Sequence, residues 1–225
     1  AELLDGLMGD FPDVPQYRLR FANALIGLGV VYREMQRYDD AEAAYKRAIE
    51  LQELLIERFG AAPEYRSGLA MTHGNLANIM RLTGRRDESE PHVALAAELR
   101  RKLADEFPNV PDYQSRLGRA LGNLGRFVAE RNEGADPARG VEILLDALTH
   151  HRAALERNPD HPEYRTRMRF DLINLSTTYL QVRSHRAAAD TIDEIITIAP
   201  PSADTILASA AILARASVLA ADDAT

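Results

Sequence analysis

The chain has 225 residues, of which 46% are apolar and 27% are charged, and its formal net charge is −7. It contains no cysteine, which excludes a disulfide framework, a thiol nucleophile and a thiolate metal site. An acidic chain lacks the basic surface on which broad nucleic-acid binding depends, so we expect no nucleic-acid partner. A chain of this length can bury a large core without a metal, and we expect no cofactor.

A Pro-x-Tyr element recurs along the chain, at spacings of 48, 48 and 51 residues. Its copies begin at Pro15, Pro63, Pro111 and Pro162. Self-similarity at such a period indicates a repeat protein in which each unit packs on its neighbours. We therefore expect a single array over residues 1–225 that contains four complete units, at 15–62, 63–110, 111–161 and 162–200.

The two ends of the chain fall out of phase with this repeat. Residues 1–14 resemble the end of a second helix, and residues 201–225 resemble a first helix without its partner. We interpret each as a half unit and expect helices at 1–10 and about 202–220. Neither end has the polar character of a terminal cap, so we interpret the chain as a piece of a longer protein.

Each complete unit contains two helical patterns. The first begins at the Pro-x-Tyr element, because proline suits the first turn of a helix, where a backbone N–H has no intrahelical acceptor. The second follows a short polar break, as from Asp39 to Arg58, and ends near proline or glycine. No segment shows the alternation typical of a strand, so we expect an all-α fold of antiparallel helix pairs.

The third unit is three residues longer than the first two. We expect the extra length in the loop at 132–137, where insertions are well tolerated. In this loop Asp136 is suited to cap the next helix, and Pro137 is suited to be its first residue.

Small and large residues recur at fixed places in the two helices of a unit. In the first unit these residues are Leu28, Gly29, Tyr32, Ala41, Tyr45 and Ala48. The pattern resembles the tetratricopeptide repeat (TPR) family, in which small residues let two helices approach closely. The resemblance implies an α-solenoid, with the antiparallel helix pairs wound into a right-handed superhelix.

Two further resemblances are more specific. Units of about 48 residues exceed the usual TPR length and resemble the repeats of kinesin light chains. The phrase Phe-Pro-x-Val-Pro-x-Tyr, present from Phe107 to Tyr113, resembles the C-terminal TPR regions of bacterial serine/threonine protein kinases.

The TPR resemblance implies a non-catalytic scaffold that binds a peptide segment of a protein partner in a concave groove. A second hypothesis is a regulatory or substrate-recruiting region of a bacterial serine/threonine kinase, which upstream kinase motifs would establish. A third and remote hypothesis is a helical-array hydrolase. The chain has none of the glycine-rich, Asp-Phe-Gly or His-Glu-x-x-His motifs of kinases and metalloproteases, so we expect no enzyme activity.

Positive charge gathers in the first helices, which line the groove in this family. The windows 15–35, 63–83, 111–131 and 162–182 contain twelve Arg and six Asp or Glu, although the whole chain is acidic. Arginine can hold a carboxylate with two hydrogen bonds, and asparagine can bond a peptide backbone. An acidic segment is therefore the expected partner, and a solvated face with incidental charge is the alternative. The groove residues implied by the resemblance are Asn23, Arg33, Asn75, Asn78, Arg81, Arg119, Asn123, Arg126 and Asn174.

The family's carboxylate clamp is matched only in part. Asn78 and Asn123 occupy its asparagine positions, but Gly74 and Phe170 stand where it has lysine, and Asn174 where it has lysine or arginine. Recognition of a free peptide C-terminus is therefore not expected.

The histidines have no metal-ligand spacing. Adjacent residues of a helix point in different directions, so His150 and His151 cannot share a ligand, and we expect both on the surface. His73 takes a position that is leucine in the other units, and we expect it in the interior with a hydrogen bond.

The last helix contains many aliphatic residues that a following helix would cover: Ile206, Leu207, Ile212, Leu213, Val218 and Leu219. We expect this surface to be exposed or to mediate self-association. The stretch 208–221 is interrupted by Arg215 and is predicted to be too short and too polar to cross a membrane. No signal peptide is recognisable, and the expected location is the cytoplasm.

Overall fold

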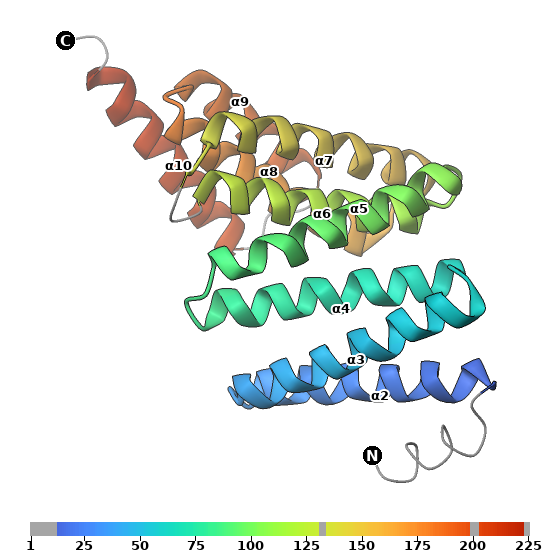
Figure 1. The fold of residues 1–225 in the computed structure, drawn as a ribbon. Coiled ribbons are helices and arrows are strands. Elements are labelled where there is room, and N and C mark those ends of the chain that lie inside the picture. The colour runs from blue at the N-terminus through green and yellow to red at the C-terminus, as the bar shows by residue number, and fades with distance from the viewer. Residues whose placement is uncertain (1–12, 131–133, 199–202, 223–225) are drawn as a thin grey trace. The chain divides into compact units, whose positions relative to one another are not determined.

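A computed structural model describes residues 13–130, 134–198 and 203–222, and every element in these ranges is a helix (Figure 1). The predicted all-α class, built of packed antiparallel helix pairs, is confirmed. The expected helix at residues 1–10 lies outside the described residues.

The chain divides into two compact units, Ala1–Leu103 and Ala104–Thr225, and the boundary falls within helix α5. A single array over residues 1–225, its right-handed superhelix and a concave groove shared by both units therefore stay predictions.

The first unit contains α2 (Pro15–Glu34), α3 (Tyr38–Phe59), α4 (Pro63–Leu82), a short 3-10 helix (Asp87–Ser89) and most of α5 (Glu90–Glu106). The second contains α6 (Pro111–Glu130), α7 (Pro137–Arg157), α8 (Pro162–Gln181), α9 (His185–Ile198) and α10 (Ala203–Asp222). We call α2, α4, α6, α8 and α10 the first helices and the others the second helices. Every first helix has 20 residues.

Proline and a left-handed residue mark the two ends of the first helices. The Pro-x-Tyr proline opens α2, α4, α6 and α8, as predicted. At the far end, Gln36, Gly84 and Arg183 take positive φ at the same position of their repeats. The N–H of the next residue bonds back to Tyr32, Met80 and Tyr179 respectively, which closes the helix and turns the chain into its partner.

The loop before α7 is closed as the sequence predicts. The Asp136 carboxylate accepts a hydrogen bond of 2.9 Å from the Arg139 backbone N–H, and Pro137 is the first helical residue. An N-cap of this kind satisfies a backbone donor that the helix itself leaves unpaired.

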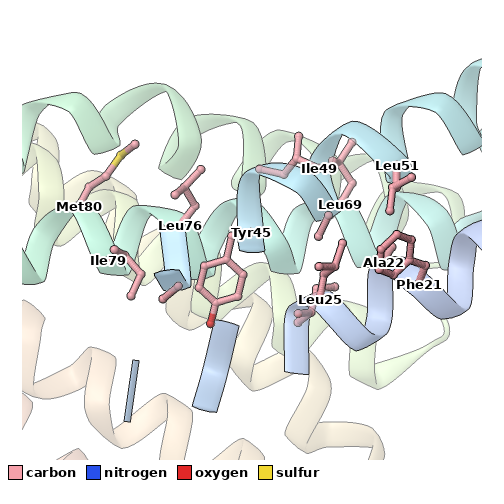
Figure 2. Packing of buried hydrophobic residues seen from close by; sticks show 13 residues of the cluster. Phe21, Ala22, Leu25, Tyr45, Ile49, Leu51, Leu69, Leu76, Ile79 and Met80 are labelled. Atoms are coloured by element: carbon pink, nitrogen blue, oxygen red, sulfur yellow. The ribbon is translucent and has the colours of Figure 1, made fainter. Parts of the chain in front are cut away.

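The core of the first unit depends on a close approach of α2 and α3. Figure 2 shows aliphatic and aromatic side chains from α2, α3 and α4 gathered into one cluster around the fully buried Tyr45. A Cβ placed on Gly29 would lie 2.5 Å from the Tyr45 ring, so only glycine leaves room for the ring. Leu28, one of the large residues of the repeat pattern, is 46% exposed.

The second unit uses small residues in the same way. A Cβ on Gly125 of α6 would come within 2.9 Å of the Leu144 side chain of α7. In the next pair, Ser176 of α8 takes the equivalent position, and its hydroxyl donates a hydrogen bond of 2.7 Å to the Ala188 carbonyl of α9. Leu144, Leu148, Leu172, Ile192 and Ile195 form the centre of this core.

Buried polar pairs join one repeat to the next. The Thr72 hydroxyl of α4 donates to the Gln52 side-chain oxygen of α3 over 2.9 Å. In the second unit, His151 of α7 and Asp171 of α8 are 3.0 Å apart, between Nε2 and Oδ2. The prediction that His151 lies on the surface was wrong, because the side chain is completely buried. Its neighbour His150 is partly exposed and contacts the Gln114 side chain.

His73 is an interior histidine, as predicted. Its Nδ1 lies 2.8 Å from Nδ1 of His92 on α5, so one imidazole donates to the other, and the rings are stacked. Burial, and to a lesser extent the charge of His92, lowers the pKa of His73 to about 4 from 6.5.

Two glycines of α2 provide a matched pair of substitutions. Gly29→Ala should cost about 1–3 kcal/mol, because the new methyl group displaces the buried Tyr45 ring. Gly27→Ala should stabilise the chain by about 0.5–1 kcal/mol, since a Cβ there meets no atom within 4 Å and alanine favours the helix. Urea unfolding followed by circular dichroism measures both. Equal effects of the two substitutions would contradict the close packing at Gly29.

The first unit should lose stability as the pH falls from 6.5 towards 4. In this window the unfolded chain binds a proton at His73 that the folded chain does not. His73→Leu inserts the residue that the other first helices have at this position. Between pH 7 and pH 5 the wild type should lose about 2 kcal/mol more than this variant. Parallel stability curves for the two proteins would show that His73 is not held neutral.

Candidate functional site

One polar stripe runs the length of α6. Its members follow alternating spacings of four and three residues, which place them on one side of a helix. None of them is buried, whereas the residues between them include the core side chains Leu117 and Leu121. The stripe consists of Asp112, Arg116, Arg119, Asn123, Arg126 and Glu130.

The first helix of the next repeat has a stripe at the same six positions, and α8 packs beside α6. Its members are Glu163, Arg167, Phe170, Asn174, Thr177 and Gln181. Two contacts join the stripe of α8 to α6. The Arg167 guanidinium donates to the Ser115 hydroxyl over 2.9 Å, and the Arg126 guanidinium lies 5.7 Å from the centre of the Phe170 ring. We call the central residues of both stripes the α6–α8 face: Arg119, Asn123, Arg126, Arg167, Phe170 and Asn174.

Arg119 is the cation of this face that lacks a partner. Arg116 pairs with Asp112 over 2.6 Å, and Arg167 pairs with Glu163. Among the described residues, Arg119 has neither a hydrogen bond nor an ion pair. Loss of solvent around the side chain, and then the charge of Arg167, lowers the pKa of Arg119. A nearby anion would compensate both effects.

The amides and the aromatic ring complete the face. The Asn174 side-chain amide donates to the Asp171 carboxylate over 3.3 Å, which leaves its own carbonyl oxygen available. The Asn123 amide makes no hydrogen bond with the described residues. Phe170 is 49% exposed, and such a ring offers an apolar surface beside the cations. The face therefore presents positive charge, amide groups and one apolar contact together.

The structure places the predicted groove residues in two sets. Arg119, Asn123, Arg126 and Asn174 are brought together in the second unit. The first unit holds the others: Asn23 and Arg33 on α2, and Asn75, Asn78 and Arg81 on α4.

In the first unit most of the predicted side chains have local partners. Arg33 lies 3.7 Å from the Glu34 carboxylate, and the Arg81 guanidinium donates to the Asn78 side-chain oxygen over 2.9 Å. Asn75 is half-buried and makes no hydrogen bond with the described residues. This set is consequently less open to an added anion than the second-unit set.

Sequence reasoning missed Arg116, Arg167 and Phe170 as members of the stripes. The signal was present in the sequence, since these residues follow the helical spacing of the recognised ones. Phe170 aligns with Arg119, and Arg167 aligns with Arg116. Arg33 and Arg81 align with Ala129 and Leu180, which are buried in the second unit, so they lie at the edge of the equivalent stripe.

No catalytic domain is evident in the described residues. His151 and Asp171 form the acid–imidazole pair that a hydrolase requires, but both are buried and no substrate can reach them. In the described ranges no group of three or more His, Asp or Glu residues is placed to hold a metal ion.

Helix α10 packs through Ile212 and Ala216 onto the second core, and its other side is open. A pocket of about 250 Å³ lies between α9 and α10, lined by Ile192, Ile196, Ile206, Ser209, Ala210 and Leu213. The window Ala203–Ala221 has a mean hydropathy of 1.5, and by length and composition alone it could cross a membrane. The stretch 208–221, predicted to be too short and too polar to cross a membrane, is the C-terminal part of this longer window, and that statement stays a prediction.

Comparison with known families identifies the first helix pair. Residues 22–53 match the family model of the tetratricopeptide repeat. They run from α2 into α3, so this helix pair is similar to a tetratricopeptide repeat. Repeats of this kind are typically protein–protein interaction modules and are generally not catalytic. The resemblance to kinesin light chains and bacterial kinases stays a hypothesis.

Solved structures resemble the chain at low sequence identity. TTC0263, a thermophilic TPR protein in Thermus thermophilus, is 19% identical, and the match covers 86% of this chain and 99% of that chain with a TM-score of 0.42. YrrB, a TPR protein with an unusual peptide-binding site, is 18% identical over 92% of this chain and 84% of that chain, with a TM-score of 0.43. The de novo designed helical repeat protein DHR64 is 12% identical over 95% and 96%, with a TM-score of 0.29. No curated protein sequence matches the chain, and none of these structures assigns a role to its residues.

Proposed function

We propose that this chain is a non-catalytic scaffold that binds an acidic segment of a protein partner on the α6–α8 face. The observation that carries the proposal is Arg119, an unpaired cation that stands on one helical face with Asn123 and Arg126. A cation without a counter-ion beside other arginines favours an anionic ligand.

The chemistry of the face suits an extended peptide. The Arg119 guanidinium can hold a carboxylate with two parallel hydrogen bonds. The amides of Asn123 and Asn174 can bond the peptide backbone, because each amide has both donor and acceptor groups. The exposed Phe170 ring offers a place for an apolar side chain next to the acidic one.

The predicted residues of the first unit belong to the same proposal as a second contact surface: Asn23, Arg33, Asn75, Asn78 and Arg81. Whether this surface and the α6–α8 face line one concave groove depends on how the two units are placed. The regulatory or substrate-recruiting role beside a bacterial kinase is supported by the phrase at Phe107–Tyr113 alone. A cytoplasmic location is part of the proposal.

Self-association through α10 is also part of the proposal. Ile206 and Leu207 are 55% and 68% exposed, and the open pocket lies beside Ile206. A second copy presents the same apolar patch, and two such patches can cover each other about a two-fold axis.

Replacing Arg119 and Arg126 with alanine should weaken the binding of an acidic peptide by about tenfold to a hundredfold, because charge-assisted hydrogen bonds are lost. The probe is a capped twelve-residue peptide of alternating Glu and Phe, measured by fluorescence anisotropy at several salt concentrations. Its counterpart has Gln in place of every Glu. The double variant should also show a flatter salt dependence.

The control for this experiment removes the same amount of positive charge outside the α6–α8 face. Arg139→Ala with Arg157→Ala removes two exposed arginines from α7, away from the face, and should leave the affinity unchanged. Two outcomes would contradict binding at this face and indicate a solvated surface with incidental charge. One is unchanged affinity in the Arg119/Arg126 variant, and the other is equal binding of the Glu and Gln peptides by the wild type.

Light scattering at several protein concentrations tests the patch on α10. The wild type should increase in mass with concentration. Ile206→Glu should reduce this, since it places a charge in the apolar pocket lining. Ala211→Glu is the matched control, because Ala211 is exposed on the same helix but does not line the pocket. A wild type that stays monomeric at every concentration would contradict self-association.

A further inference from the structure

The two buried polar pairs between repeats occupy equivalent positions, but their side chains differ chemically. Gln52 and Thr72 are 20 residues apart, as are His151 and Asp171. Thr72 and Asp171 occupy the same position of α4 and α8, ten residues into each helix. The pair in the first unit contains no ionisable group, whereas the pair in the second unit contains a carboxylate.

The space for the titratable pair is built into α6. A Cβ on Gly122 would collide with the Asp171 carboxylate, and a Cβ on Gly118 would lie 2.8 Å from the His151 ring. Both side chains are almost completely shielded from solvent, at 0% and 2% exposure. Two glycines one turn apart thus make room for a hydrogen-bonded pair that occupies the position of Gln52 and Thr72.

The Asp171 carboxylate lies directly beneath the α6–α8 face. Its Oδ1 accepts the hydrogen bond from the Asn174 amide, and its Oδ2 accepts from Nε2 of His151. The charges of Arg126 and Arg119 on α6 interact with it. The carboxylate therefore contacts one residue of the face and acts electrostatically on two others.

Other titratable groups on the packed helices are directed elsewhere. On α7, Asp146 lies 3.5 Å from His150, and Arg152 pairs with Glu194 of α9. The charged residues in the described part of α10, Asp204 and Arg215, are exposed. Burial raises the pKa of Asp171 despite its bonds to His151 and Asn174.

We propose that the His151–Asp171 pair makes the α6–α8 face proton-responsive, so that uptake of one proton strengthens its binding of acidic segments; this rests on the proposed function. With a neutral imidazole donating to the carboxylate, the pair carries a charge of −1. One added proton brings this charge to zero on either side chain. The field of Arg119 and Arg126 is then less compensated, and an anion binds more tightly. Reciprocally, a bound anion favours the protonated pair.

The test measures the affinity of the alternating Glu/Phe peptide from pH 8 to pH 5.5, above the range in which its own carboxylates titrate. The wild-type affinity should rise on the order of fivefold as the pH falls. Asp171→Asn removes the negative charge of the pair, so at pH 8 it should already bind with the low-pH affinity of the wild type. The double variant His151→Gln with Asp171→Thr copies the Gln52–Thr72 pair and should also be independent of pH. His150→Gln, the control for an adjacent histidine, should keep the wild-type profile.

A pH profile of Asp171→Asn that equals the wild-type profile overturns the inference, and so does a wild-type affinity that is independent of pH; the proposed function stands in both cases. Absence of peptide binding at every pH overturns the proposed function. The NMR signal of the Asn174 side-chain amide then decides the inference without a ligand. A shift with pH that Asp171→Asn abolishes retains the proton-responsive face, and a signal independent of pH overturns it.

Discussion

The close approach of the two helices in each pair is the constraint on which the rest of the structure depends. Gly29 leaves room for the Tyr45 ring, and Gly125 leaves room for Leu144. Because the backbones meet there, the apolar side of each first helix is held against its partner. The polar stripe of the same helix is then turned away from the partner, since both patterns share one helical period. The position of Arg119, Asn123 and Arg126 on an open face therefore follows from packing on the opposite side of α6.

Much of this arrangement could be predicted from the sequence because the signals are local and repeated. The Pro-x-Tyr element predicts where four first helices begin, and Asp136 with Pro137 predicts the cap of α7. Each signal acts through a backbone donor or a fixed dihedral angle, and neither requires a distant contact. The interior position of His73 was predictable for a related reason. The other repeats have leucine there, and Leu25, Leu121 and Leu172 are buried at this position.

The sequence was less informative wherever a side chain depends on a residue in another helix. His151 and His150 are adjacent, and which of them is buried is decided by Gly118, the glycine of α6 that opens space for the His151 ring. Leu28 is one of the large residues of the repeat pattern but lies exposed. The stripe on α8 was overlooked because its residue types differ from those of α6, and Phe170 stands where α6 has Arg119. In each case the sequence gives the residue type but not the contact with another helix that determines whether the side chain is buried.

Differences between equivalent positions are consequently the most informative feature of this chain. Packing requires that equivalent positions have similar volume, so similar volume says little about function. At the repeat junction, the Thr72 hydroxyl donates a hydrogen bond to the Gln52 side-chain oxygen without any charge, so a neutral pair is sufficient to join two repeats. His151 and Asp171 in the same place require two glycines and the removal of a carboxylate from solvent. Burying the Asp171 carboxylate costs free energy, although a neutral pair would suffice at this position. We therefore infer that the pair has a role beyond packing. The hydrogen bond from the Asn174 amide to Asp171 connects this pair to the face that carries the unpaired Arg119.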